Sequence, residues 1–339
     1  MRRRVLVLLA FVAAFLVVAA GFFLIIGQPP LATLGKLVSY AVGDPYSLSE
    51  TLVKTTPILF CALAVIVPAR LGLISVGGEG QFYFGALLGT GFMLFAIDWP
   101  AWLLMPGILV AGALGGAIWA SIAGVLKARI GVNETIVTLL LNYPALFLVN
   151  ALTFGPWRDP ASLGWPASAR FPEDARLPQL FDTRVHLGLV IGIIVAVACH
   201  VALTRTRWGL GLSVLRGNAK VAAMVGLHRS RQILVTMAIG GALAGFAGIA
   251  EASVIEGRLQ QGISVGYGLT GFLVAWLTGH NALVAIVVSF LIGGLVAAGD
   301  ALQLFARIPS ASATILQGLM FATALAIGAL AARRSAARG

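Results

Sequence analysis

Residues 205–251 read RTRWGLGLSVLRGNAKVAAMVGLHRSRQILVTMAIGGALAGFAGIAE, a basic, amphipathic stretch between two apolar runs. Each of those runs is long enough to cross a bilayer. The first part of the stretch carries only positive charges, at Arg205, Arg207, Arg216, Lys220, Arg229 and Arg231. Such a segment cannot lie in hydrocarbon, and the positive-inside bias predicts that it is cytoplasmic. A solvated loop held near anionic lipid explains the same charges.

A short helix is predicted inside this basic stretch. Asn218 has the side chain of a good N-cap, and Gly226 is typical of the position where a helix ends. We therefore expect a helix of about two to three turns between them.

The composition indicates a polytopic membrane protein. Of the 339 residues, 59% are hydrophobic and 10% are charged, whereas soluble domains have about 25% charged residues. The net charge of +11 lies mainly in short loops between apolar runs, which argues against nucleic acid as a partner. The two cysteines lie inside apolar runs and the four histidines are scattered, so no metal site is expected.

We predict an all-α fold with about ten transmembrane helices and both termini in the cytoplasm. The loops assigned to the cytoplasm hold most of the lysines and arginines, which supports this orientation. The predicted spans are residues 5–26, 52–69, 76–97, 102–126, 134–154, 187–203, 232–250, 267–278, 282–298 and 310–332.

A glycine-rich stretch at residues 71–89, LGLISVGGEGQFYFGALLG, places polar side chains inside the membrane. A carboxylate at the bilayer centre costs about 2.5–3.5 kcal/mol, so Glu79 is expected to face a cavity or a partner, with Gln81 close by. The alternative is that the glycines allow close helix packing and Glu79 lies at the cytoplasmic margin beside Arg70.

A second glycine-broken segment, SVGYGLTGFLVAWLTG at residues 264–279, shares Ser-Val-Gly and a terminal Leu-x-Gly with residues 75–89. The predicted topology makes the two segments run in opposite directions. Opposed broken segments are typical of an inverted repeat with the substrate path between them. This interpretation makes Tyr267 and Thr270 candidate path residues, and chance similarity of two short segments is the alternative.

A third stretch at residues 133–150, NETIVTLLLNYPALFLVN, carries polar residues at helical spacing. Glu134, Thr138 and Asn142 approach one face of a helix. The amide of Asn142 would lie inside the membrane and needs a partner, either another helix or a polar substrate. Tyr143 is suited to stacking on a base ring or to packing.

Together these stretches resemble ABC-importer permeases of the branched-chain amino acid, sugar and nucleoside family, and they are most similar to its nucleoside and simple-sugar branch. GNAKVAAMVG from Gly217 and GGALAGFAG from Gly240 resemble its cytoplasmic coupling region and the helix that follows. The match to its Asn-Ile-Gly-x-Glu-Gly-Gln motif departs at Ser75 and Val76. Its Asn/His-Glu-x-Ile-x-Thr-x-x-x-Asn-Tyr motif is matched at Asn133, Glu134, Ile136, Thr138, Asn142 and Tyr143.

The resemblance implies one multi-pass permease subunit of an ABC importer in the bacterial inner membrane. Its expected partners are a second, related permease chain, a cytoplasmic ATPase and an extracytoplasmic binding protein or lipoprotein. ATP would be bound and hydrolysed on the ATPase, so this chain would have no catalytic residue, metal or cofactor. Nucleosides are the expected cargo, and ribose- or galactose-type sugars are the alternative.

On this interpretation residues 1–339 form one permease domain. Its parts are a first helix and external segment (1–50), a first helix group (51–204), a coupling loop (205–231) and a second helix group (232–332). The residues expected to couple to the ATPase are Gly217, Asn218, Ala222, Ala223, Gly226 and Leu227. The residues expected on the substrate path are Glu79, Gln81, Thr138, Asn142, Tyr143, Tyr267 and Thr270.

A rival hypothesis is a stand-alone secondary transporter that is driven by an ion gradient, with Glu79 as the proton-coupling carboxylate. A membrane enzyme finds no support, because the sequence has no catalytic cluster or nucleophile motif.

Overall fold

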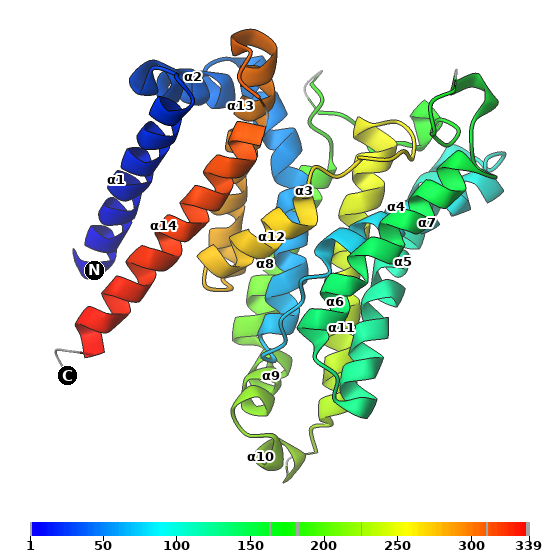
Figure 1. Cartoon of the computed structure of the whole chain (residues 1–339). Coiled ribbons are helices and arrows are strands. Elements are labelled where there is room, and N and C mark those ends of the chain that lie inside the picture. Colours follow the sequence, from blue (N-terminus) through cyan, green and yellow to red (C-terminus); the bar gives the residue numbers. More distant parts are fainter. Residues whose placement is uncertain (1, 163, 181–182, 225, 310, 337–339) are drawn as a thin grey trace. The chain divides into compact units, whose positions relative to one another are not determined.

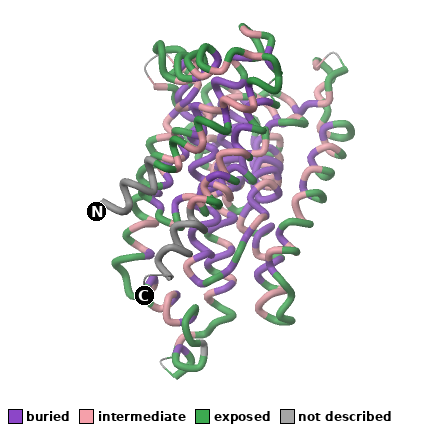
Figure 2. Tube along the Cα trace, turned by 60° about the vertical axis from the view of Figure 1, so that its left-hand side comes forward, coloured by how far each residue is buried: buried purple, intermediate pink, exposed green. Residues whose placement is uncertain are grey.

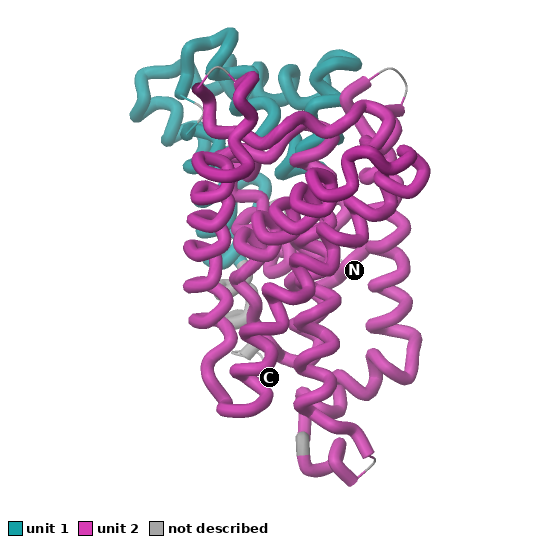
Figure 3. Tube along the Cα trace, turned by 90° about the vertical axis from the view of Figure 1, so that its right-hand side faces the viewer, with its two compact units in different colours: residues 1–54, 290–339 teal, residues 55–289 magenta. Residues whose placement is uncertain are grey.

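The computed structural model describes residues 2–162, 164–180, 183–224, 226–309 and 311–336 (Figure 1). Within these ranges the chain is helical and contains two isolated β-bridges but no strand. This confirms the predicted all-α fold class. The helices form two compact units, residues 1–54 with 290–339 and residues 55–289 (Figure 3).

The first unit contains α1 (Arg2–Ile25), α2 (Pro30–Val42), the start of α3 (Pro45–Ala69), the end of α13 (Ala282–Ala306) and α14 (Ala311–Ala336). The chain bends by 113° between α1 and α2, where Gly27 has a positive φ and a proline starts α2. The start of α1 and the end of α14 lie at the same end of this unit (Figure 1). Its core joins these helices through Ala19, Phe23, Leu37, Ala298, Leu302, Ile308 and Leu316.

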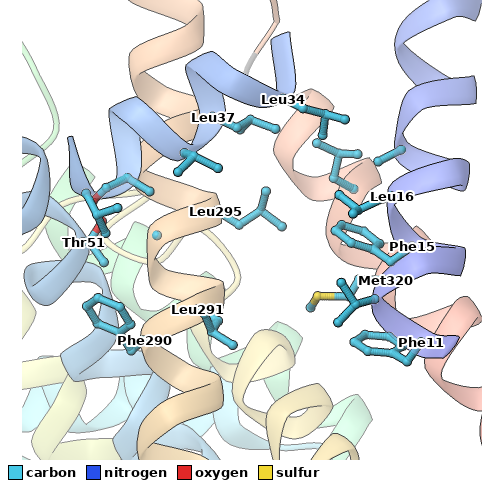
Figure 4. A pocket seen from close by; sticks show the side chains of 17 residues that line it. Phe11, Phe15, Leu16, Leu34, Leu37, Thr51, Phe290, Leu291, Leu295 and Met320 are labelled. Atoms are coloured by element: carbon cyan, nitrogen blue, oxygen red, sulfur yellow. The ribbon is translucent and has the colours of Figure 1, made fainter. Parts of the chain in front are cut away.

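A cavity of about 400 Å³ lies in the first unit (Figure 4). Its walls are aliphatic and aromatic, with Phe11, Phe15 and Phe290 among them, and Thr51 is the polar side chain in the lining. A polar solute would lose its water there without gaining hydrogen bonds. This cavity is therefore not the candidate path for a polar cargo.

The second unit is built around α11 (Arg229–Ala250), which packs against α4 (Gly78–Phe95) and α5 (Ala101–Ile130). Glycines make this packing possible, because a side chain at Gly245 would overlap the backbone of both Gly112 and Gly116 on α5. A side chain at Gly248 would likewise overlap the backbone of Phe82 on α4. Helices that approach this closely gain extensive van der Waals contact inside a membrane.

The second unit also contains residues 55–69 of α3, residues 282–289 of α13 and a further set of helices. They are α6 (Glu134–Leu140), α7 (Asn142–Phe154), α8 (Gly188–Arg205), α9 (Arg207–Gly217), α10 (Ala219–Met224) and α12 (Tyr267–Leu277), with 3₁₀ turns η1 (Pro160–Ser162) and η2 (Glu173–Ala175). A single π-helical turn, η3 (Glu251–Ile255), extends α11. The loop that carries α10 is largely exposed, in contrast to the buried positions of the packed helices (Figure 2).

The number of continuous spans differs from the prediction of ten. In the described residues six helices are long and apolar enough to cross a membrane, or seven if the bent pair α1–α2 counts as one span. The predicted span 267–278 contains only the 11-residue α12, which is about 16 Å long and cannot cross a bilayer core of about 30 Å. The predicted span 76–97 begins as a helix only at Gly78. Both helices follow non-helical chain, which includes turns at residues 70–72 before α4 and turns and bends at residues 261–266 before α12.

Candidate functional site

A non-helical segment at residues 71–77, which begins with a turn and is called the extended segment below, connects α3 to α4. Side chains of α6 hydrogen-bond to its backbone. The N–H of Ile74 donates to Glu134 Oε1 at 3.2 Å, and Thr135 Oγ1 donates to the Ile74 carbonyl at 3.1 Å. The N–H of Val76 donates to Thr138 Oγ1 at 3.1 Å. Non-helical backbone is tolerated at membrane depth only where such partners satisfy it. The polar residues of α6 therefore make this extended segment possible.

Asn142 continues this arrangement one turn further along. Its Nδ2 donates to the Val76 carbonyl at 3.0 Å, and its Oδ1 accepts from the Gly80 N–H at 2.8 Å. A Cβ at Gly80 would lie 2.9 Å from the Leu141 carbonyl oxygen, so the glycine allows the close approach. The amide thus joins the extended segment to the first turn of α4.

The second broken segment meets the first at Glu79. The Glu79 Oε2 accepts from the Gly268 N–H at 2.8 Å, in the first turn of α12. Gly266 starts that turn with φ +88°, and a side chain at Gly268 would overlap the Glu79 backbone. A carboxylate is favourable at a helix N-terminus, where N–H groups and the positive end of the helix dipole converge. The N-terminal ends of α4 and α12 are thus held together through one carboxylate.

A cavity of about 210 Å³ opens beside this junction. Glu79 and Asn142 supply polar groups and Tyr83 and Tyr143 supply aromatic rings, and Leu139, Leu146 and Leu269 complete the lining. Tyr83 is buried, whereas 61% of Tyr143 is exposed at the mouth. The cavity can therefore offer a hydrogen-bond acceptor, an amide and an aromatic face to a polar, ring-containing solute.

Three of the predicted path residues, Glu79, Asn142 and Tyr143, lie together on this cavity. The other four do not line it. Gln81 is buried and donates to Ser75 Oγ at 3.4 Å. Thr138, on α6, is buried and accepts a hydrogen bond from the backbone of the extended segment. Tyr267 is buried with its hydroxyl 3.3 Å from Glu251 Oε1, and Thr270 is also buried.

Tyr83 was not among the predicted path residues. Its hydroxyl donates to the Ser264 carbonyl at 3.5 Å, so it joins α4 to the second broken segment. Its position four residues after Glu79 places it on the same helix face. This spacing could have identified Tyr83 as a path residue from the sequence.

The predicted coupling region folds as a capped short helix. The Oδ1 of Asn218 accepts from the N–H groups of Lys220 and Val221, at 2.9 and 3.2 Å. Gly226 has φ +78°, and the Leu227 N–H donates to the Ala222 carbonyl at 3.0 Å. These bonds confirm Asn218 as the N-cap and an end of the helix near Gly226.

The exposed face of α10 differs from the set of residues expected to couple. Ala222 is fully buried against its own chain, whereas Ala223 is exposed. Val221 and Met224 are also exposed, Met224 by 84%. A partner that docks on α10 would therefore meet Val221, Ala223 and Met224, and Ala222 would support the helix from beneath. Gly217, Asn218 and Gly226 are exposed and Leu227 is half-buried.

A hydrogen bond links the region around α10 to the packed group. Trp208 Nε1, on α9, donates to Gln232 Oε1 at 2.9 Å, in the first turn of α11. Among the described residues no cluster of three or more histidine, cysteine, aspartate or glutamate side chains can hold a metal ion.

Comparison with known proteins places this geometry in a family. Residues 47–325 match the family model described as branched-chain amino acid transport system, permease component. The chain is 32% identical to a glucose ABC transporter permease protein of Haloferax volcanii, over 86% of this chain and 79% of that protein. It is 32% identical to a guanosine ABC transporter permease protein of Bacillus subtilis, over 85% and 84%.

A nucleoside ABC transporter permease protein of Lactococcus lactis is 29% identical, over 83% of this chain and 80% of that protein. The range matched by the family model, residues 47–325, includes the extended segment, the cavity and α10. The chain therefore belongs to the family of permease components of the branched-chain amino acid transport system.

Proposed function

We propose that this chain is one transmembrane subunit of an ATP-driven ABC importer that carries nucleosides across the bacterial inner membrane. The observation that carries the proposal is the junction of two broken segments at Glu79, which holds a cavity with two tyrosines and an amide. Relatives named as guanosine and nucleoside permeases support the choice of cargo. The cavity opens to the surface of this chain at Tyr143, where a second, related permease subunit would complete the path.

The proposed orientation places α9 and α10 in the cytoplasm. In the second unit Lys127 forms an ion pair with Glu134 at 2.8 Å and Arg216 lies beside Gly72, so the basic loops gather at one end. That end is cytoplasmic by the positive-inside bias. In the first unit the start of α1 and the end of α14 lie at a common end (Figure 1), which agrees with both termini being cytoplasmic.

Ten passes are retained in this proposal, with two of them made partly of non-helical chain. The first is residues 71–77 followed by α4, and the second is residues 262–266 followed by α12. The N-terminal ends of α4 and α12 meet at Glu79 and Gly268, which supports an inverted repeat with the substrate path at its centre.

ATP would act through α10. A cytoplasmic ATPase that closes on ATP would press on Val221, Ala223 and Met224, and the Trp208–Gln232 bond would pass the motion to α11. Gly245 lies against Gly85, and Gly248 lies against Phe82. Because α11 contacts α4 backbone to backbone, a tilt of α11 displaces α4 and with it the Glu79 side of the cavity. An extracytoplasmic binding protein or lipoprotein would deliver the cargo to the other side.

Nucleosides fit the cavity's chemistry because a base can stack on Tyr143, and Glu79 and Asn142 offer polar groups to the base edge or the ribose hydroxyls. Sugars of the ribose or galactose type remain the second candidate, since a relative named as a glucose permease is equally identical. Uptake of labelled guanosine by proteoliposomes with the complete transporter tests the choice. We expect unlabelled adenosine or guanosine to compete at concentrations at which ribose and glucose do not, and the reverse order would show a sugar permease.

A further inference from the structure

A second polar cavity, of about 190 Å³, lies at the basic end of the second unit. It is formed where α3 ends, where α8 ends and where the chain turns from α12 into α13. Its lining residues are Arg70, His200, Leu203, Thr204, Gly279, His280, Asn281 and Ala282. It shares no residue with the cavity at Glu79, and the transport mechanism proposed above does not use it.

Arg70 is the strongest indication that this cavity binds a ligand. Its Nε atom is buried and has no hydrogen-bond partner within the described residues. None of the lining residues that the structure describes is acidic. A buried guanidinium donor without a partner is unfavourable, and a bound anion would satisfy it.

His280 adds a second observation. It adopts φ +63°, in the left-handed region that side chains with a Cβ rarely enter. Its backbone N–H donates to the Ala275 carbonyl at 2.9 Å, and its ring packs edge-on against Trp276 with centroids 5.2 Å apart. These contacts hold an unfavourable backbone conformation that keeps the imidazole on the cavity.

The other polar groups of the lining also favour an anion. The Oδ1 of Asn281 accepts from the N–H groups of Leu283 and Val284, so its Nδ2 is the group left to donate. Burial is the main cause that lowers the pKa of His280, and the nearby positive charge of Arg216 lowers it further; Arg216 thus adds a positive potential beside the cavity. A bound anion would offset that potential.

The position of the cavity indicates which anion reaches it. The residues of α8 that precede it, Val197 and Val201, are 45% and 46% exposed. On the first turns of α13, Val284 and Val287 are 44% and 60% exposed. Apolar, exposed helix faces of a membrane protein contact lipid chains, and the cavity lies at the ends of these faces. That is the level of the lipid phosphate groups.

We propose that this cavity binds the phosphate group of an anionic phospholipid in the leaflet on the basic side of the chain. The phosphate oxygens accept from the Arg70 guanidinium and the Asn281 amide, and the acyl chains lie along α8 and α13. Basic pockets between helices are a general means of holding anionic head groups. The lipid would fix the end of α3, from which the extended segment of the transport site begins.

Native mass spectrometry of the full chain after release from detergent tests this assignment. Samples are incubated with phosphatidylglycerol, with phosphatidylcholine or with inorganic phosphate. We expect phosphatidylglycerol to be retained in preference to phosphatidylcholine, and Arg70→Gln to weaken its retention about tenfold, as expected for the loss of a charge-assisted hydrogen bond. Arg129→Gln is the matched control, because Arg129 carries the same charge at the same end but is exposed and outside the cavity.

A second variant, His280→Asn, keeps a residue that tolerates the left-handed region and is expected to weaken retention while the chain stays folded. Equal loss of lipid from the Arg70 and Arg129 variants would overturn the proposal, since the binding would then be unspecific attraction. Binding of inorganic phosphate that depends on Arg70, with lipid retention unchanged, would also overturn it and would assign the cavity to a soluble phosphate.

Discussion

Replacing Asn142 with leucine tests the view that this side chain supports the extended segment. The substitution keeps a similar volume but removes the donor to the Val76 carbonyl and the acceptor for the Gly80 N–H. A buried group that loses its partner costs about 1–3 kcal/mol, so two such groups cost about 2–6 kcal/mol. Asn142 is half-buried beside an open cavity, and water can reach part of it. We therefore expect a loss of about 2–3 kcal/mol.

Hydrogen exchange of the purified chain in nanodiscs measures this loss locally. The Gly80 amide should exchange about 30- to 150-fold faster, because each 1.4 kcal/mol corresponds to a factor of ten. Asn150→Leu is the matched control on the same helix, since the Asn150 Oδ1 is buried without a hydrogen-bond partner within the described residues. Its exchange rates should change by no more than about twofold.

Unchanged exchange at residues 74–80 in the Asn142 variant would refute this reasoning. The same would follow if both variants were destabilised equally, because the effect would then come from the loss of an asparagine rather than from its two bonds. A fall in nucleoside uptake with unchanged exchange would instead assign Asn142 to substrate contact.

Three further predictions concern packing, coupling and pH. Gly245→Ala should lower the free energy of unfolding by about 2 kcal/mol or more, because the added methyl group would overlap the backbone of α5. The control Gly318→Ala has open space around the added methyl group and should be neutral or stabilising by up to about 1 kcal/mol. Thermal unfolding of both variants in detergent measures the difference. Met224→Glu should reduce the stimulation of ATPase activity by transport substrate without changing thermal stability, because Met224 is exposed on α10. Ala222→Glu should destabilise the chain itself, because Ala222 on α10 is buried. Equal unfolding temperatures for the two variants would contradict this assignment of the exposed and buried faces of α10. Burial lowers the pKa of His186 to about 4, so the folded state binds a proton on His186 less readily than the unfolded state does. The free energy of unfolding should therefore fall by about 2–3 kcal/mol as the pH drops from 6.5 to 4. The variant His186→Gln should show a smaller decline over the same pH range.

Features that depend on a few neighbouring residues were predictable from the sequence. The N-cap at Asn218 follows from its side-chain chemistry and the glycine at Gly226. The shared face of Glu134, Thr138 and Asn142 follows from helical spacing. The similarity of the glycine-broken segments at residues 75–89 and 264–279 was visible in the sequence, with chance as the alternative, and the structure brings their helix ends together at Glu79 and Gly268.

Features that depend on distant contacts were not predictable in this way. Glu79 and Gly268 are 189 positions apart, and no local pattern identifies a backbone N–H as the partner of a carboxylate. The spans beginning at residues 76 and 267 were expected to be interrupted by glycines, but the extent of the non-helical chain before α4 and α12 was not predicted, because hydropathy does not distinguish a helix from non-helical chain whose backbone is satisfied by another helix. α10 is only six residues long, so its sequence did not reveal that Ala222 faces inward.

The cavity at Glu79 is proposed to lie on an ATP-driven route for nucleosides. The test uses proteoliposomes that contain the Tyr143→Cys, Cys199→Ala double variant together with its second permease, ATPase and binding protein. Uptake of labelled guanosine is measured before and after a thiol reagent modifies the cysteine at position 143. We expect uptake that requires ATP, that stops when position 143 is modified and that is protected from this modification by excess guanosine. Uptake by the purified chain alone, driven by a proton gradient and unaffected by that modification, would contradict this proposal.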